Sequence, residues 1–115
     1  MTTLSLLVLR SRNLQRAVEF YRALGLRFNP EQHGSGPVHY SADLGGVIVE
    51  LYPLAADAPP TGSPRLGFTV DELDEKLLTL EAMGVKIVTQ PKETAWGRRA
   101  IVKDWDNHTI ELVSR

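Results

Sequence analysis

The sequence predicts an α+β fold made of two βαβββ modules, each a curved mixed sheet with one helix outside, set around a cleft. An apolar strand, a helix ending in Ala-Leu-Gly or Ala-Met-Gly, and a strand carrying Glu-Leu occur in that order twice. The interval from Gly25 to Gly84 nearly equals that from Glu50 to Glu111. Two landmarks that repeat at one interval indicate a duplicated structural unit.

The chain length is that of a single domain. Its 115 residues are enough to bury a core without disulfides or a structural metal. Residues 53–64 contain four prolines and one glycine and lack an apolar period, so they are expected to link the modules. We therefore expect one domain, 1–115, composed of module 4–52, linker 53–64 and module 65–113.

The first module opens with the apolar run 4–9, which is typical of a strand covered on both faces. Asn13 has the side chain of a helix N-cap, and apolar residues follow it at helical spacing as far as Leu24. Gly25 then ends the helix, because glycine adopts the left-handed conformation easily. The remaining strands are expected at 26–29, 38–43 and 47–52.

The second module repeats this order. A strand at 66–70 leads to a helix that is expected to start at an Asp71 cap and to end at Gly84. Three further strands are expected at 85–89, 99–103 and 109–113. The last two would form a hairpin around residues 104–108.

Composition excludes several classes of function. The formal net charge of −1 and the pI near 6.3 give no basic field for nucleic acid or an anionic membrane. Cysteine is absent, which removes thiolate chemistry. The apolar N-terminal run is short and lacks a preceding basic region, so it is interpreted as a strand rather than a signal peptide. We expect no nucleic-acid or membrane partner and, by default, a cytoplasmic location.

Three segments resemble the vicinal oxygen chelate superfamily, which includes glyoxalases, extradiol dioxygenases, fosfomycin-resistance transferases and bleomycin-binding resistance proteins. Residues 13–26 are similar to its first helix, and residues 66–73 to the strand that opens its second half. Residues 96–99 and 104–112 resemble its terminal hairpin, with Trp105 in place of proline and Asn107 in place of glycine. Asparagine tolerates positive φ in such a turn.

The resemblance also implies where a metal would bind. Metalloenzymes of this superfamily take ligands from the first strand of each half and from the Glu-Leu strands, positions that correspond to Leu6, Arg65, Glu50 and Glu111. A hydrocarbon cannot donate to a metal, and a guanidinium that stays protonated repels one. No residue is assigned as a metal ligand, and no cofactor is expected.

Five residues are predicted to bind a ligand. Strand alternation places Glu50 and Glu111 toward the cleft, and the resemblance makes Arg65 the nearest partner of Glu111. Trp96 precedes a strand where the family places an aromatic ring over its ligand. His39 lies in mid-strand. Apart from Glu50, each of these residues also has a purely structural interpretation: an internal ion pair for Glu111 and Arg65, a core or loop-anchoring role for Trp96, and a structural hydrogen bond for His39. None of the three histidines in the sequence shows metal-ligand spacing to another.

These observations favour a metal-independent small-molecule binding protein of the glyoxalase/bleomycin-resistance type that captures a small organic ligand. The alternative is a divergent metal-dependent glyoxalase-like lyase or dioxygenase that uses Glu50 and Glu111, with His39 as a third ligand. An interaction module whose cleft is filled by its own side chains is a third interpretation. Whether a reaction is catalysed stays open, and a homodimer is expected because single modules would leave sheet edges unpaired.

Overall fold

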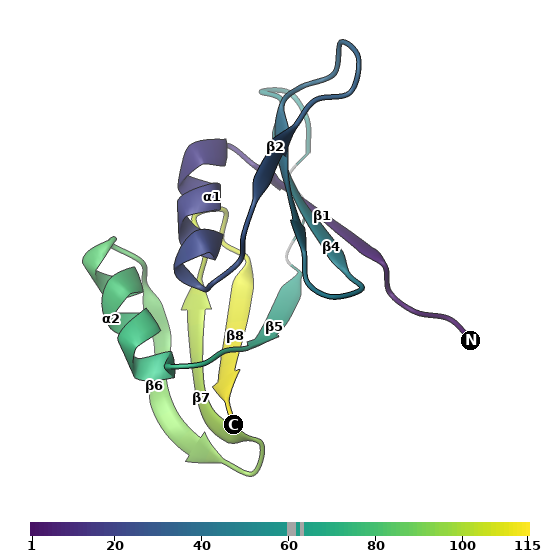
Figure 1. Ribbon diagram of the computed structural model, residues 1–115. Coiled ribbons are helices and arrows are strands. Elements are labelled where there is room, and N and C mark those ends of the chain that lie inside the picture. Colours follow the sequence, from purple (N-terminus) through teal and green to yellow (C-terminus); the bar gives the residue numbers. More distant parts are fainter. Residues whose placement is uncertain (60–61, 63) are drawn as a thin grey trace. The chain divides into compact units, whose positions relative to one another are not determined.

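The computed structural model describes residues 1–59, 62 and 64–115, and it shows an α+β chain of two mixed sheets and two helices (Figure 1). The chain divides into two compact units, Met1–Thr61 (unit 1) and Gly62–Arg115 (unit 2), and each is described by itself. Part of the predicted linker, residues 60, 61 and 63, lies outside the described residues. Over the described ranges, no helix is long and apolar enough to cross a membrane.

Unit 1 is a four-stranded sheet with one helix. Strand β4 lies between β1, to which it is parallel, and β3, to which it is antiparallel, and β2 forms the other edge beside β3. The elements are β1 (Leu6–Ser11), α1 (Leu14–Ala23), β2 (Asn29–Glu31), β3 (His39–Asp43) and β4 (Ile48–Pro53).

Unit 2 has the same topology. Strand β8 lies between its parallel neighbour β5 and its antiparallel neighbour β7, and β6 is the edge strand beside β7. The predicted βαβββ order therefore occurs twice, as expected. The elements are β5 (Arg65–Thr69), α2 (Leu73–Ala82), β6 (Ile87–Thr94), β7 (Gly97–Lys103) and β8 (Thr109–Ser114).

The start and end of α1 follow the sequence prediction. Asn13 Oδ1 accepts a hydrogen bond from the backbone N–H of Arg16, and Gly25 has a φ of +107°. Phe20 and Tyr21 are fully buried, with their rings edge to face at 4.8 Å. The cap fixes where the helix begins, and burial of its apolar face stabilises it.

The start of α2 differs from the prediction. The N-cap is Glu72, in the left-handed region at φ +54°, and its side chain makes no capping hydrogen bond. Asp71, the predicted cap, instead offers its backbone carbonyl to Lys76 Nζ at 2.6 Å. Burial of Leu73, Leu77 and Leu80 therefore stabilises α2. The acidic side chains of its first turn add to this, because negative charge is favourable at the N-terminus of a helix.

Two strands are displaced from their predicted ranges. The segment 26–29 was expected to pair, but the ladder of β2 begins only at Asn29, although Leu26 and Phe28 are buried. The strand expected at 85–89 runs instead as Ile87–Thr94 and passes through a register shift near Pro91. Apolar burial and strand pairing are separate requirements, and the sequence pattern reports the first more directly.

Each sheet has one buried face and one open face. In unit 2, Ala100, Val102, Ile110 and Leu112 are fully buried on the face that α2 covers, while their neighbours along the strands are only partly buried. Unit 1 repeats this pattern, with Val49 and Leu51 on the buried face. We call the side opposite the helix the open face, and it carries the polar residues considered next.

Candidate functional site

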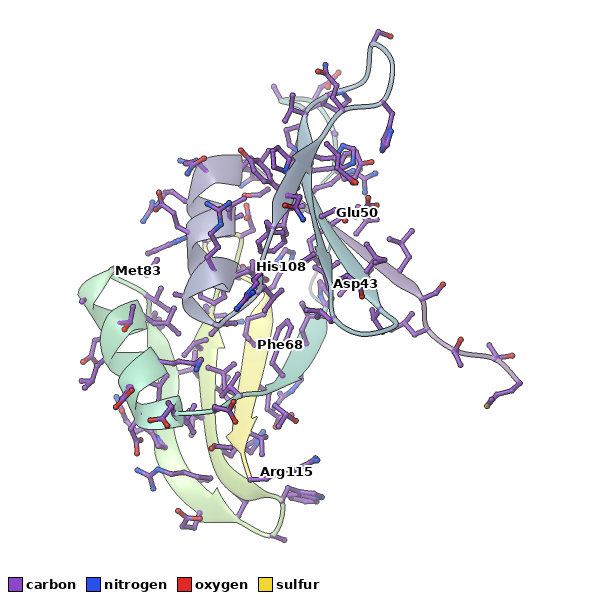
Figure 2. The ribbon with its side chains drawn as sticks, in the orientation of Figure 1. Asp43, Glu50, Phe68, Met83, His108 and Arg115 are labelled. Atoms are coloured by element: carbon purple, nitrogen blue, oxygen red, sulfur yellow. The ribbon has the colours of Figure 1, made fainter. Side chains whose placement is uncertain are left out.

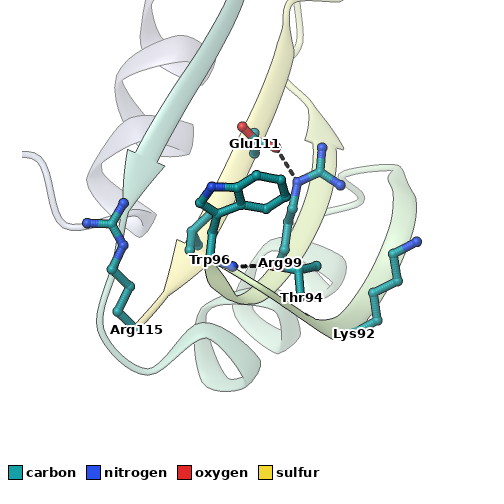
Figure 3. Close-up of a pocket in the computed structure, with 7 residues that line it drawn as sticks. Lys92, Thr94, Trp96, Arg99, Glu111 and Arg115 are labelled. Carbon is teal, nitrogen blue, oxygen red and sulfur yellow. Dashed lines mark hydrogen bonds and ion pairs between the residues drawn. The ribbon is translucent and has the colours of Figure 1, made fainter.

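The open face of unit 2 contains a pocket of about 560 Å³. Its base is formed by side chains of β7 and β8, and its rim by the hairpin between β6 and β7 together with the end of β8 (Figure 3). Three of its side chains are cationic and one is a carboxylate. We call it the Trp96 pocket, and it is lined by Lys92, Thr94, Trp96, Arg99, Glu111, Val113 and Arg115.

Glu111 is held by two guanidinium groups. Arg99 Nε donates a hydrogen bond to Glu111 Oε1, and Arg65 Nη2 lies 3.6 Å from the same oxygen. Arg65 therefore approaches Glu111 as the sequence prediction required. Arg99, however, was not predicted and makes the closer contact. It follows Arg98 on β7 and faces Val113 across the ladder, so strand register and not composition brings it to Glu111.

This pairing keeps Glu111 ionised. The hydrogen bond from Arg99, followed by the positive charges of Arg99 and Arg65, lowers the pKa of Glu111 from its ordinary value, and partial desolvation opposes the shift only in part. Glu111 is thus a charged acceptor that is already engaged by the protein. This geometry agrees with the internal ion pair that the sequence analysis held as an alternative.

Trp96 stands at the tip of the β6–β7 hairpin and is 70% exposed. Its backbone N–H donates to Thr94 Oγ1 at 3.2 Å, while the same hydroxyl donates to the Gly97 carbonyl at 2.7 Å. In the view of Figure 3 the indole lies between Arg115 on one side and Arg99 and Lys92 on the other. Trp96 is therefore not a core residue: a braced turn presents its ring at the pocket.

A second polar cluster lies on the open face of unit 1 and contains two of the predicted residues. His39 is buried, and its ring stacks on Tyr52 at 4.1 Å with 8° between the planes. His39 Nε2 lies 3.6 Å from Glu50 Oε2 and 3.3 Å from the Tyr52 hydroxyl. Glu50 projects from the neighbouring strand β4 (Figure 2).

The hairpin formed by β2 and β3 adds two residues that sequence reasoning missed. Glu31 Oε1 lies 3.4 Å from His39 Nε2, and the rings of His33 and His39 are 5.1 Å apart. Because Glu31 pairs with His39 across the ladder, the hairpin alone explains the contact. The available signal was His33 and His39 on either side of the Gly34–Pro37 turn. We call Glu31, His33, His39, Glu50 and Tyr52 the His39 cluster.

The predicted site residues thus form two groups. Arg65, Glu111 and Trp96 belong to unit 2, whereas Glu50 and His39 belong to unit 1. The cleft that would be shared by both modules stays a prediction. Within unit 2, a sheet surface with an exposed indole and several cations suits capture of a flat, anionic organic molecule.

Comparison with known proteins places the chain in a family. The sequence profile of the Glyoxalase/Bleomycin resistance protein/Dioxygenase superfamily matches residues 3–112. The chain belongs to this superfamily. The resemblance drawn from the helix and hairpin motifs is thereby confirmed.

Several known proteins are similar to this chain over most of their length. An uncharacterized protein of Mycolicibacterium smegmatis is 30% identical over 101 residues, which cover 86% of this chain and 82% of that protein. The structure of TnmS3, an antibiotic binding protein from Streptomyces sp. CB03234, is similar with a TM-score of 0.75 and 27% identity, over 99% and 96% of the two chains. A glyoxalase/bleomycin resistance protein from the same strain is 26% identical, with a TM-score of 0.69 over 96% and 99%.

The metal positions implied by the superfamily resemblance do not fit an ion in this member. Leu6 offers no donor atom and is half exposed, and Arg65 places a permanent cation 3.6 Å from Glu111. The hydrogen bond from Arg99 adds a second cation at the same carboxylate. A divalent ion beside Glu111 would face repulsion from both guanidinium groups.

Proposed function

We propose that this chain is a metal-independent small-molecule binding protein of the glyoxalase/bleomycin-resistance type, and that the Trp96 pocket binds an organic anion with a flat apolar body. One observation carries the proposal: an exposed indole and three cationic side chains line the same pocket, where the one carboxylate side chain is already paired. The antibiotic-binding activity named for the relative TnmS3 supports the same class of function.

In this proposal each side chain has a separate role. The Trp96 ring offers a broad apolar surface on which a flat ligand stacks, and the Thr94 hydrogen bonds hold the turn before the ligand arrives. Arg99, Lys92 and Arg115 supply positive charge for an acidic group of the ligand. Glu111 orients Arg99 and Arg65 through its ion pairs. Glu50 and His39 stay proposed ligand contacts of the other module.

The proposal predicts a preference for charge that a matched pair of probes can measure. 2-Naphthoate and the uncharged 2-naphthamide share a ring system and differ in one group. We expect isothermal titration calorimetry at low salt to show tighter binding of 2-naphthoate by about tenfold, which corresponds to about 1.4 kcal/mol. Equal affinities for the two probes would contradict the preference for an anion. Loss of 2-naphthoate binding in EDTA would contradict the independence from metal.

Variants separate stacking from charge. Trp96→Ala should weaken both probes by about tenfold or more, because aromatic anchors contribute most to such sites. Arg99→Gln should weaken 2-naphthoate and leave 2-naphthamide unchanged. Trp105→Phe is the control, since Trp105 lies against Gly84 at the end of α2 and outside the pocket lining. Naphthoate binding that survives Trp96→Ala would assign the ligand to another surface.

The homodimer also stays a prediction. Its basis is the four-stranded sheet of each unit, whose edge strands carry backbone groups that can pair with another chain. Light scattering coupled to gel filtration should give twice the chain mass of 12.8 kDa. A mass equal to that of one chain across the concentration range would contradict the dimer.

A further inference from the structure

The His39 cluster on unit 1 combines three metal-ligand side chains outside the positions that the superfamily uses. One carboxylate oxygen of Glu31 and one ring nitrogen each of His33 and His39 all lie within 4.8 Å of one another. Glu31 ends β2, His39 begins β3, and His33 opens the turn between them, where its carbonyl accepts from Gly36 N–H at 3.0 Å. A short hairpin is therefore sufficient to bring these three side chains together.

The orientation of the His39 ring is fixed by its backbone neighbour. His39 Nδ1 lies 3.3 Å from the Pro37 carbonyl oxygen. A carbonyl can only accept, so Nδ1 carries a hydrogen, and in the neutral ring Nε2 is then the nitrogen that offers a lone pair to the cluster. A carbonyl that fixes the tautomer of a histidine in this way is the usual support of a metal-binding imidazole.

Negative charge converges on that lone pair. His39 Nε2 faces Glu31 Oε1 at 3.4 Å and Glu50 Oε2 at 3.6 Å, and ionised carboxylates, like the lone pair, are acceptors. The Tyr52 hydroxyl, at 3.3 Å, can donate to the nitrogen but cannot offset the charge of the two carboxylates. A cation at this point would satisfy all three acceptors together.

The donor set selects a class of ion. Two imidazoles and a carboxylate suit zinc and its neighbours among the divalent transition metals, whereas magnesium and calcium prefer oxygen ligands alone. Ligands bonded to zinc at about 2.0–2.1 Å lie about 3.3 Å apart, so the cluster must contract. His33 is exposed and lies in a turn, and its ring can move inward while the buried His39 stays in place.

We propose that Glu31, His33 and His39 form a binding site for a divalent transition-metal ion, with Glu50 beside it as a second carboxylate. This site is separate from the Trp96 pocket, whose residues all belong to unit 2. The ion would tie the β2–β3 hairpin together and balance the charge of the carboxylates. Because the two sites share no residue, binding of an organic ligand at the Trp96 pocket does not require this ion.

The first test is titration of ZnCl₂ into a tag-free, EDTA-treated chain in a non-chelating buffer. We expect saturable binding of one ion per chain. His33→Ala and Glu31→Gln should each weaken it by about tenfold or more, as loss of a ligand removes a metal–protein bond. Glu19→Gln removes an exposed carboxylate of α1 and is the matched control for Glu31→Gln. Trp96→Ala should leave zinc affinity unchanged.

A second measurement identifies the nitrogens involved. Long-range ¹H–¹⁵N spectra of the histidine rings should show zinc-dependent shifts at His33 and His39, with the Nδ1 hydrogen of His39 retained. His108 serves as the internal control, because its Nδ1 is bonded to Asp104 at 2.7 Å. Absence of saturable zinc binding, undiminished binding by His33→Ala, or shifts that leave His39 unchanged would each overturn the proposed site.

Discussion

Replacing Asp104 by alanine should lower the free energy of unfolding by about 3–5 kcal/mol, because it leaves the buried His108 ring without the carboxylate that pairs with it. Asp104 Oδ1 accepts hydrogen bonds from the backbone N–H groups of Asp106 and His108, each at 2.9 Å, and Oδ2 lies 2.7 Å from His108 Nδ1. Both side chains are 2% exposed. Chemical denaturation followed by circular dichroism measures the loss.

The same pair predicts how stability depends on pH. The hydrogen bond to Asp104, and then its charge, raises the pKa of His108 above the ordinary value of 6.5 despite burial. The folded protein therefore holds this proton more tightly than the unfolded chain does. The contribution of this pair to the free energy of unfolding is complete below pH 6.5, and it is lost as the pH rises through the raised pKa of His108. The free energy of unfolding should fall over that interval.

Two variants complete this test. His108→Gln should remove most of the pH dependence, since the titrating group is gone. Asp57→Ala, at an exposed aspartate, should change the free energy of unfolding by less than about 0.5 kcal/mol. A wild-type stability that stays level or rises from pH 6.5 upward would contradict the assigned charge on His108.

Replacing Gly97 by alanine should lower the free energy of unfolding by about 2–4 kcal/mol, from collision and backbone strain together. Gly97 has a φ of +127°, and a Cβ atom there would lie 2.5 Å from the backbone oxygen of Ser114. The hairpin and the end of β8 would have to separate. Since Trp96 and Arg115 flank this contact, affinity for 2-naphthoate should fall as well.

Gly45→Ala provides the matched control. Gly45 also has positive φ, at +79°, but a Cβ atom there meets nothing within 4 Å. It should therefore show only backbone strain, about 1–2 kcal/mol. Equal losses of stability in the two variants, measured by the same denaturation experiment, would show that the approach of Ser114 to Gly97 is unimportant.

Much of the fold could be predicted because its signals are local. Asn13 and Gly25 delimit α1 through a side-chain hydrogen bond and a positive φ, both of which depend on residue type. Asn107, predicted to tolerate positive φ in the last turn, adopts +68°. The predicted cap of α2 was wrong: Glu72 takes that place without a side-chain hydrogen bond, and the buried Leu73 follows it as the first residue of the helix.

The candidate site was predictable only in part. Alternation along β4 and β8 correctly put Glu50 and Glu111 on the faces opposite the helices, and it gave no indication that Arg99 would contact Glu111. Likewise, the turn between His33 and His39 was visible in the sequence, but nothing in the pattern linked Glu31 to His39. These contacts run between strands, where register sets the neighbours and composition does not.

The sequence by itself determined the doubled βαβββ order, the glycines that end the helices and the absence of metal donors at Leu6 and Arg65. The reason is that apolar period, backbone preference and side-chain chemistry are properties of single residues or short segments. The tertiary structure alone decided that two guanidinium groups hold Glu111, that Trp96 is presented to solvent, and that two histidines meet across a turn. Those outcomes depend on distances across a sheet, which are fixed only when the strands pair.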